Sequence, residues 1–462
     1  MYIYIARFFM AAIAHSTALA LSNLQQHEGL AFKESFSSQH MSEVMARHGT
    51  DFRDRSYPPD LTLTAFCSQL ISADRSCRET VVRVNRDRTM LGLVPLSSST
   101  SAYCQARSRL SLDLIKDLAL ESGHFLETAA PSSWLWKGHH TKLLDGSTLS
   151  MPDTPENQSV WPQHDQQEDG IGFPIIRIVA LLSLATAGCL GLAYGPYQGK
   201  ETGEHALARE LLPLINQDDI ILADRYYCSY FLMAQLLARG ANLITRLHGA
   251  RAYDFRRGVR LGDGHHIVEL VKPPRPKWMD QDTYDSIPDT LSLREMKGDY
   301  KDDDGEEVIV VTTLLKPESY PRSEVLAAYR LRWNVELDLR SLKSVMGMDI
   351  LSCKTPSMIE KEIWTYILAY NLIRQLICQA AAKHSLEPRS ISFTGAIQTF
   401  NAFLPLFNIN QPEFSKRMYT AMVDMIAQMK IPHRPGRSEP KAVKRRPKAY
   451  PRLMTSRSKT KK

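Results

Sequence analysis

The chain has 462 residues, more than one ordinary hydrophobic core accommodates, and this length predicts two or three domains. A hydrophobic content of 44% and a charged content of 23% are typical of a globular, soluble protein. The seven cysteines include no Cys-x-x-Cys pair, which argues against a zinc site or a disulfide framework and favours free thiols in a reducing cytoplasm.

The positive charge is concentrated at the C-terminal end. Residues 430–462 contain thirteen Lys or Arg residues and one acid, Glu439, whereas the rest of the chain has a net charge of −5. The Pro and charge content of this basic tail argues against a packed core. Such a tail suits a polyanion such as DNA, and a disordered, solubilising end explains the charge equally well.

Residues 1–22 form an apolar N-terminal segment with some features of a signal peptide, including an Ala-Leu-Ala cleavage site that ends at Ala20. Its only basic residue, Arg7, lies inside the apolar run and not before it. Arg7 and His15 also interrupt the run as a membrane span. We therefore favour a buried helix or a misassigned start over an exported protein, and we expect no membrane partner.

Helical periodicity dominates residues 23–138, where apolar residues recur at three- and four-residue spacing. Five arginines fall between Arg75 and Arg88. This combination predicts a helical domain that binds DNA, although a helical bundle with a charged surface would show the same pattern.

Residues 139–248 change to strands, and we predict three strands followed by helix, strand, helix and strand, an α/β layout. These elements are expected at 141–151, 173–186, 191–197, 204–215, 218–225, 229–240 and 241–247. Gly and Pro clusters break the order over 249–305, which predicts a small β insertion. The core resumes over 306–390 with a buried strand and a long helix capped by Ser323, and residues 391–429 form C-terminal helices.

Two acids follow apolar strands in this core. Asp145 lies where a strand meets a predicted Gly turn, and Asp224 directly follows four apolar residues. A carboxylate there is costly to bury unless it is paired or binds a metal, although turn formation or helix capping explains either acid alone. A third acid from a helix would complete an oxygen-ligand site for divalent metals such as Mg²⁺.

The predicted long helix carries such an acid. At 100° per residue, Tyr329, Arg332, Glu336 and Lys343 share one narrow face about 21 Å long. An ordinary i,i+4 ion pair explains Arg332 and Glu336, but it does not explain the other two residues. The remaining charged residues of this stretch have no assigned role and are expected to be solvated; they are Arg330, Asp338 and Arg340.

The pattern Y-x2-R-x3-E-x6-K resembles the signature of one branch of the bacterial DDE insertion-sequence transposases, insertion-sequence family four. Two further blocks, LLDGSTLSMPDTPEN and ILADRYYCSYFL, resemble the family segments that carry the first and second Asp. The stretch from 173 to 205 and the tail segment RPGRSEPKAVKRRPKAYP are also similar to this family. The resemblance covers roughly residues 60 to 450 and has its blocks in the family's order.

The resemblance implies an α/β fold with an RNase H-like catalytic core, in two parts at 139–248 and 306–390, interrupted by the β insertion. It implies that the helical domain at 23–138 binds the DNA ends of the element. The catalytic, metal-binding residues would be Asp145, Asp224 and Glu336. They would hold two Mg²⁺ ions, with Mn²⁺ as an alternative, for in-line phosphoryl transfer.

The resemblance further implies a DNA transposase that releases a 3′-OH at each element end, passes through a hairpin and joins the end to target DNA. DNA-binding residues beside the cut would be Tyr329, Arg332 and Lys343. The expected partners are double-stranded DNA, as terminal repeats and target, and a second copy of the chain. The expected location is the cytoplasm, associated with the nucleoid. Trp278 is the one Trp of the insertion, but no motif marks it as the aromatic that holds a flipped base.

Two alternatives stay open from the sequence. A hydrolytic nuclease of the same fold would use the same acids without holding a DNA end through several steps. A non-catalytic DNA-binding derivative of an insertion-sequence transposase would keep the fold without the reaction.

Overall fold

The structure is a computed structural model. It describes residues 43–44, 46–48, 56–90, 92–166, 168, 170–199, 202–301, 305–407, 412–431 and 455. The apolar segment 1–22 and almost all of the basic tail lie outside these residues, so the interpretations placed on them stay predictions.

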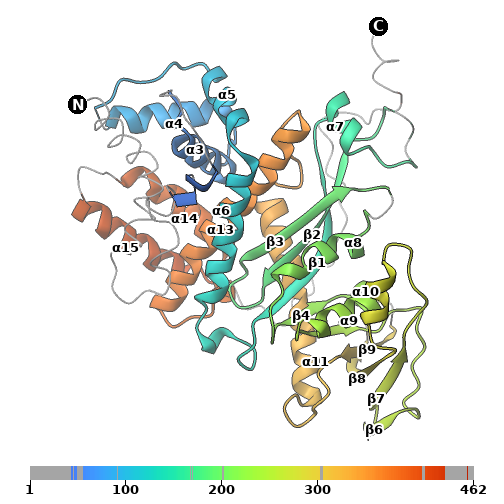
Figure 1. The fold of residues 1–462 in the computed structure, drawn as a ribbon. Coiled ribbons are helices and arrows are strands. Elements are labelled where there is room, and N and C mark those ends of the chain that lie inside the picture. Colours follow the sequence, from blue (N-terminus) through green and yellow to red (C-terminus); the bar gives the residue numbers. More distant parts are fainter. Residues whose placement is uncertain are drawn as a thin grey trace.

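A nine-stranded mixed sheet forms the centre of the molecule, in the order β3-β2-β1-β4-β5-β9-β8-β7-β6 (Figure 1). The strands are β1 Thr141–Ser150, β2 Ile175–Ser183, β3 Cys189–Pro196, β4 Ile220–Ala223, β5 Asn242–Arg246, β6 Val259–Gly262, β7 His265–Val271, β8 Thr290–Lys301 and β9 Glu307–Thr312. The first five agree in order and type with the strands predicted from the sequence.

Strand β1 is antiparallel to β2 and parallel to β4, and β4 is parallel to β5. Strand β9 pairs with β5 in antiparallel register, with Thr312 opposite Ile244, and β8, β7 and β6 follow. The strands of the predicted β insertion therefore extend the core sheet and do not form a sheet of their own.

Side chains alternate between the two faces of the core strands, as the strand repeat requires. Leu143 and Leu222 pack into a large core shared with helices α12 (Asn334–Arg340) and α13 (Pro356–Lys383). Leu144 and Ile221 pack into a second core with α8 (Glu204–Glu210) and α9 (Tyr230–Ala238). The helices from the sheet region onward are α7 Pro155–Val160, α8 Glu204–Glu210, α9 Tyr230–Ala238, α10 Gln281–Ser286, α11 Arg322–Arg330, α12 Asn334–Arg340, α13 Pro356–Lys383, α14 Phe393–Phe403 and α15 Pro412–Gln428.

The N-terminal helices pack with the C-terminal ones in one helical body on one side of the sheet (Figure 1). They are α3 Pro59–Ile71, α4 Cys77–Met90, α5 Ser101–Arg109 and α6 Leu112–Thr128. The buried Asn371 of α13 joins this helical body to the sheet: its Oδ1 accepts the Cys189 N–H over 2.8 Å, and its Nδ2 donates to the Ser122 hydroxyl of α6 over 3.0 Å. Within the described part of the region predicted at 23–138, α6 is thus packed directly onto the sheet and α13.

The long helix predicted before residue 347 is interrupted. A 3-10 turn, Leu331–Trp333, separates α11 from α12, and a π turn, Ser341–Val345, follows α12. The predicted cap is also wrong: the helix begins at Arg322, and Pro321 precedes it with no side-chain cap, so Ser323 lies within the first turn. Pro321 disfavours a helical backbone at the residue before it, Tyr320, which favours a helix start after this point.

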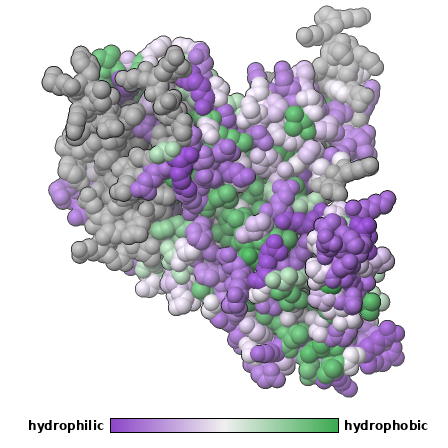
Figure 2. Space-filling model, viewed as in Figure 1, coloured by the Kyte–Doolittle hydropathy of each residue, from purple (hydrophilic) through white to green (hydrophobic). Residues whose placement is uncertain are grey.

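Hydrophilic side chains cover most of the described surface in the view of Figure 2, with smaller hydrophobic patches between them. No helix in the described ranges combines the length and the apolarity needed to cross a bilayer.

Candidate active site beside β1 and the end of β4

Asp145 and Asp224 lie on neighbouring parallel strands. Leu144 of β1 is paired with Ala223 of β4, and each acid is the next residue along its strand. Residues at the same level of a parallel pair face the same side of the sheet. The structure therefore brings the two strand-borne acids together at one edge, which we call the acidic edge.

Asp145 does not lie at a strand end, as the predicted Gly turn implied, because β1 continues without a break from Thr141 to Ser150. Strand β2 pairs along it up to Ser150, so the backbone beyond Gly146 keeps its hydrogen-bond partners. Gly146 does not form a turn. It leaves room for the Glu204 side chain, because a Cβ atom at position 146 would lie 2.4 Å from the Cδ of Glu204. The Glu204 carboxylate thus packs against the backbone beside Asp145.

Burial raises the pKa of the Asp145 carboxyl to about 6. The Gly146 N–H, which donates to Oδ1 over 2.8 Å, opposes this shift. The charges of Asp224 and Glu204 raise the pKa further, and the Arg332 guanidinium lowers it. Carboxylates at the acidic edge therefore repel one another, a condition that a bound cation relieves.

Asp224 caps the 3-10 turn that follows β4, Arg225–Tyr227. Its Oδ1 accepts the N–H of Tyr226 over 2.8 Å, and its backbone carbonyl accepts the hydroxyl of Thr245 on β5 over 2.6 Å. Asp224 therefore has the capping role that the sequence analysis gave as one explanation for it. It caps this turn and also lies at the acidic edge.

Glu336 lies on α12, one helical turn after Arg332. Its Oε1 lies 3.6 Å from an Nη2 of Arg332, and the Glu336 side chain is 42% exposed against 18% for Arg332. The same guanidinium lowers the pKa of Asp145. The Arg332 guanidinium thus interacts electrostatically with both Glu336 and Asp145. The i,i+4 ion pair between Arg332 and Glu336 that the sequence predicted is present.

Tyr329 lies near the end of α11, and Lys343 lies in the π turn that follows α12. Burial raises the pKa of the Tyr329 phenol to about 12, and the charge of Asp224 acts in the same direction. Lys343 Nζ donates to the hydroxyl of Ser147 on β1 over 2.7 Å, and burial lowers the pKa of this amine. Both side chains therefore lie toward the strands of the acidic edge even though the helix is broken.

The expectation that the other charged residues of this segment are solvated is wrong for Asp338. Its side chain is 1% exposed and forms ion pairs with Arg374 and Arg389. Arg330 and Arg340 are exposed, as expected.

Sequence reasoning did not single out Glu204, the first residue of α8. Its Oε2 lies 3.5 Å from the hydroxyl of Tyr227, and burial and the charge of Asp224 raise its pKa. An acid that starts a short helix has no distinguishing pattern in the sequence. Trp278 of the insertion packs against Arg209 of α8, whose guanidinium carbon lies 3.7 Å from the Trp278 ring centroid.

Within the described part of the chain, no three His, Cys, Asp or Glu side chains lie close enough together to hold a metal ion. The chemistry of the acidic edge still suits a hard cation, because its donors are carboxylate oxygens whose charges repel one another. The structure brings Asp145 and Asp224 together there, whereas the predicted convergence of Glu336 with them is not present in it.

Comparisons with known proteins point to one family. A family model described as Transposase DDE domain matches residues 136–372, about half of the chain and all of the acidic edge. The chain is 26% identical over 420 residues to the transposase InsG for insertion sequence element IS4 of Escherichia coli K12, which covers 89% of this chain and 91% of that protein. It is 27% identical over 143 residues to the putative transposase InsZ of the same organism, covering 31% of this chain and 47% of that protein.

The chain therefore belongs to the bacterial insertion-sequence transposases with a DDE domain, as its resemblance to insertion-sequence family four predicted. Among solved structures, a piggyBac transposase synaptic complex with hairpin DNA aligns with a TM-score of 0.42 and 14% identity, over 88% of this chain and 86% of that one. That TM-score is below the level at which a shared fold follows.

Proposed function

We propose that this protein cuts DNA at the ends of an insertion sequence and joins those ends to target DNA. The observation that carries this proposal is the register of β1 and β4, which sets Asp145 and Asp224 at one level of neighbouring parallel strands. The strand order 3-2-1-4-5, with only β2 antiparallel within it, is the arrangement expected of an RNase H-like core.

Three carboxylates would hold the divalent cations of this reaction: Asp145, Asp224 and Glu336. Two Mg²⁺ ions, or Mn²⁺ in their place, would supply the positive charge that stabilises the attacking and leaving oxygens of phosphoryl transfer. Glu336 now contacts Arg332 at 3.6 Å, and its 42% exposure leaves the carboxylate accessible from solvent.

The cationic side chains beside the acids would bind the DNA backbone. Arg332 offers a planar guanidinium suited to a phosphate, and the Lys343 amine is held at β1 by the Ser147 hydroxyl. Tyr329 is only 7% exposed, so its contribution would come from the phenol edge or from packing under the DNA. Contacts of this kind position the strand without reading its sequence.

The reaction would proceed in four transfers at one site. Water attacks the phosphodiester at the element end and releases a 3′-OH. That hydroxyl attacks the opposite strand and closes a hairpin, and a second water opens the hairpin, takes its phosphate as the 5′ end and regenerates the 3′-OH. The freed 3′-OH then attacks target DNA, and a second copy of the chain would process the other end.

The test is cleavage of double-stranded DNA that carries the sequences flanking this coding region, with Mg²⁺, by the full chain. We expect nicks at the element ends, 3′-OH products and end-joined products with target plasmid. Glu336→Gln should abolish them, because the amide keeps the shape and removes the charge. Glu324→Gln is the matched control, since Glu324 lies on α11 and pairs with the exposed Lys137 instead.

Other outcomes would contradict the proposal in different ways. Cleavage of DNA without preference for the flanks would favour a hydrolytic nuclease. Binding of the flanks with no cleavage in either Mg²⁺ or Mn²⁺ would favour the non-catalytic derivative. Equal activity in wild type and Glu336→Gln would remove the acidic edge from the reaction.

A further inference from the structure

Asp338 follows Glu336 by two residues on α12 and is buried with 1% exposure. A buried carboxylate destabilises the folded state unless it is paired and hydrogen-bonded. Arg389 meets it in a two-pronged contact, with Nη2 to Oδ2 at 2.8 Å and Nη1 to Oδ1 at 3.1 Å. Arg374 of α13 donates from Nη2 to Oδ1 over 3.1 Å. We call these three residues the Asp338 clasp.

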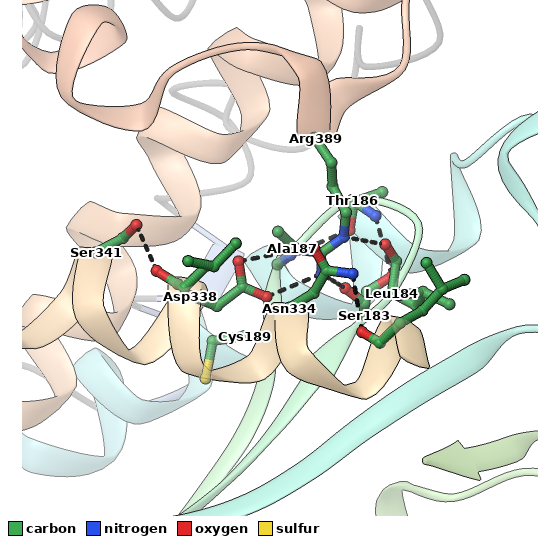
Figure 3. Close-up of polar contacts among 12 residues, drawn as sticks. Ser183, Leu184, Thr186, Ala187, Cys189, Asn334, Asp338, Ser341 and Arg389 are labelled. Carbon is green, nitrogen blue, oxygen red and sulfur yellow. Dashed lines mark hydrogen bonds and ion pairs between the residues drawn. The ribbon is translucent and has the colours of Figure 1, made fainter. Parts of the chain in front are cut away.

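The clasp continues into the turn between β2 and β3. Arg389 also donates to the carbonyls of Ser183 and Leu184 at the end of β2, and Figure 3 shows its guanidinium between this turn and Asp338. Arg374 donates to the hydroxyl of Tyr370, which in turn donates to the Ala187 carbonyl over 2.8 Å. One carboxylate therefore ties α12 to the hairpin that pairs with β1.

The helix that carries Glu336 cannot be positioned by its own backbone alone. Helix α12 has seven residues, with a 3-10 turn before it and a π turn after it. The 3-10 turn and the π turn contain different numbers of residues per turn from an α-helix. The direction in which the side chains of α12 point therefore does not follow from α11. A slip of one residue would turn Glu336 by about 100° away from the acidic edge.

We propose that Asp338 is a positioning residue that fixes the rotation of α12 and so holds Glu336 toward Asp145 and Asp224. The assignment rests on the proposed function, since it concerns how the third acid is delivered. The clasp lies on the buried side of α12 while Glu336 lies on its partly exposed side. Strand β2, which the clasp holds, is hydrogen-bonded to β1, with Ala180 opposite Asp145.

The test compares wild type with Asp338→Asn. Hydrogen–deuterium exchange of the metal-free protein should rise at least five-fold in the peptide covering 331–345, with smaller changes in the β1 peptide. Mn²⁺ binding, read by electron paramagnetic resonance, should weaken about ten-fold. Single-turnover cleavage of the flanking DNA should slow about 100-fold, with a higher Mg²⁺ midpoint and DNA affinity unchanged within about two-fold.

Asp219→Asn is the matched control, because Asp219 is another buried carboxylate, 3% exposed, paired with Lys142 at the opposite end of β1 and β4. It should lower stability while leaving the Mn²⁺ affinity and the rate per active molecule as in wild type. If Asp338→Asn does not fold, the same measurements are made on Arg389→Gln. This variant removes the two-pronged contact with Asp338 and keeps the ion pair between Arg374 and Asp338.

Two results in Asp338→Asn would overturn the assignment. One is a smaller fraction of active molecules with a wild-type rate per active molecule, and the other is unchanged hydrogen–deuterium exchange over 331–345 with wild-type Mn²⁺ affinity. If Asp338→Asn does not fold, the same two results in Arg389→Gln would overturn it. A wild-type protein that neither binds Mn²⁺ nor cuts DNA would instead contradict the proposed function, so the two failures are distinguishable.

Discussion

Replacing Asp145 by Asn should stabilise the metal-free protein, although it should abolish cleavage. Burial and the neighbouring acids raise the pKa of this carboxyl from 3.8 to about 6. The folded state therefore binds its proton more tightly than the unfolded chain, and stability falls as pH rises from about 4 to above 6. Asn keeps an oxygen that accepts the Gly146 N–H and removes the charge.

The magnitude follows from the shift of about two pKa units, each worth about 1.4 kcal/mol. Linkage then gives a cost of about 3 kcal/mol for ionised Asp145 at pH 7 and about half of that at pH 5. Urea unfolding in EDTA, followed by tryptophan fluorescence at both pH values, measures the difference. Asp289→Asn is the control, because this side chain is 97% exposed and should change stability by no more than about 0.5 kcal/mol.

Saturating Mg²⁺ should reduce or reverse the stability difference between Asp145→Asn and wild type. A bound ion stabilises only the protein whose ligands are intact, which is the wild type. A wild-type protein as stable as Asp145→Asn at pH 7 in EDTA would refute the reasoning. So would a stability difference that does not shrink between pH 7 and pH 5.

Three further predictions concern two residues of β1 and the lysine that contacts this strand. Gly146→Ala should lower the free energy of unfolding in urea by about 1–3 kcal/mol, because the new Cβ meets the Glu204 carboxylate. The double variant with Glu204→Ala should recover most of this lost stability. Lys142→Ala should lose about 3–5 kcal/mol, since it leaves Asp219 buried without its ion pair, whereas an apolar replacement of both residues should lose less. Lys343→Ala should lower the salt slope of DNA binding by about one, as measured by fluorescence anisotropy, and an unchanged slope would exclude a phosphate contact.

Much of the core could be predicted from the sequence because its signals are local. Apolar runs of strand length and helical periodicity placed β1 to β5, α9 and α13 close to their observed bounds. The position of Asp224 directly after an apolar strand was likewise visible, since a strand and the residue that ends it are contiguous. The signature of the helical segment named Glu336 and its cationic neighbours before any contact was known.

Periodicity overstated the regularity of that segment. Ideal helical angles predicted one continuous helix, whereas the chain inserts a 3-10 turn and a π turn around α12. Local propensity contains little information about such changes, because packing against the sheet and α13 selects them. The same limit explains Asp338, which looks like any solvated helix acid until the buried Arg374 and Arg389 are placed beside it.

The sequence by itself therefore determined the order of the core elements, the strand-borne acids and the residue types of the helical face. Only the tertiary structure decided that Glu204 packs on Gly146, and that the predicted insertion continues the core sheet. Only it decided that Asp338 joins α12 to the β2–β3 turn. These contacts join residues far apart in the chain, and the burial and pairing that give such residues their roles exist only once the elements have packed.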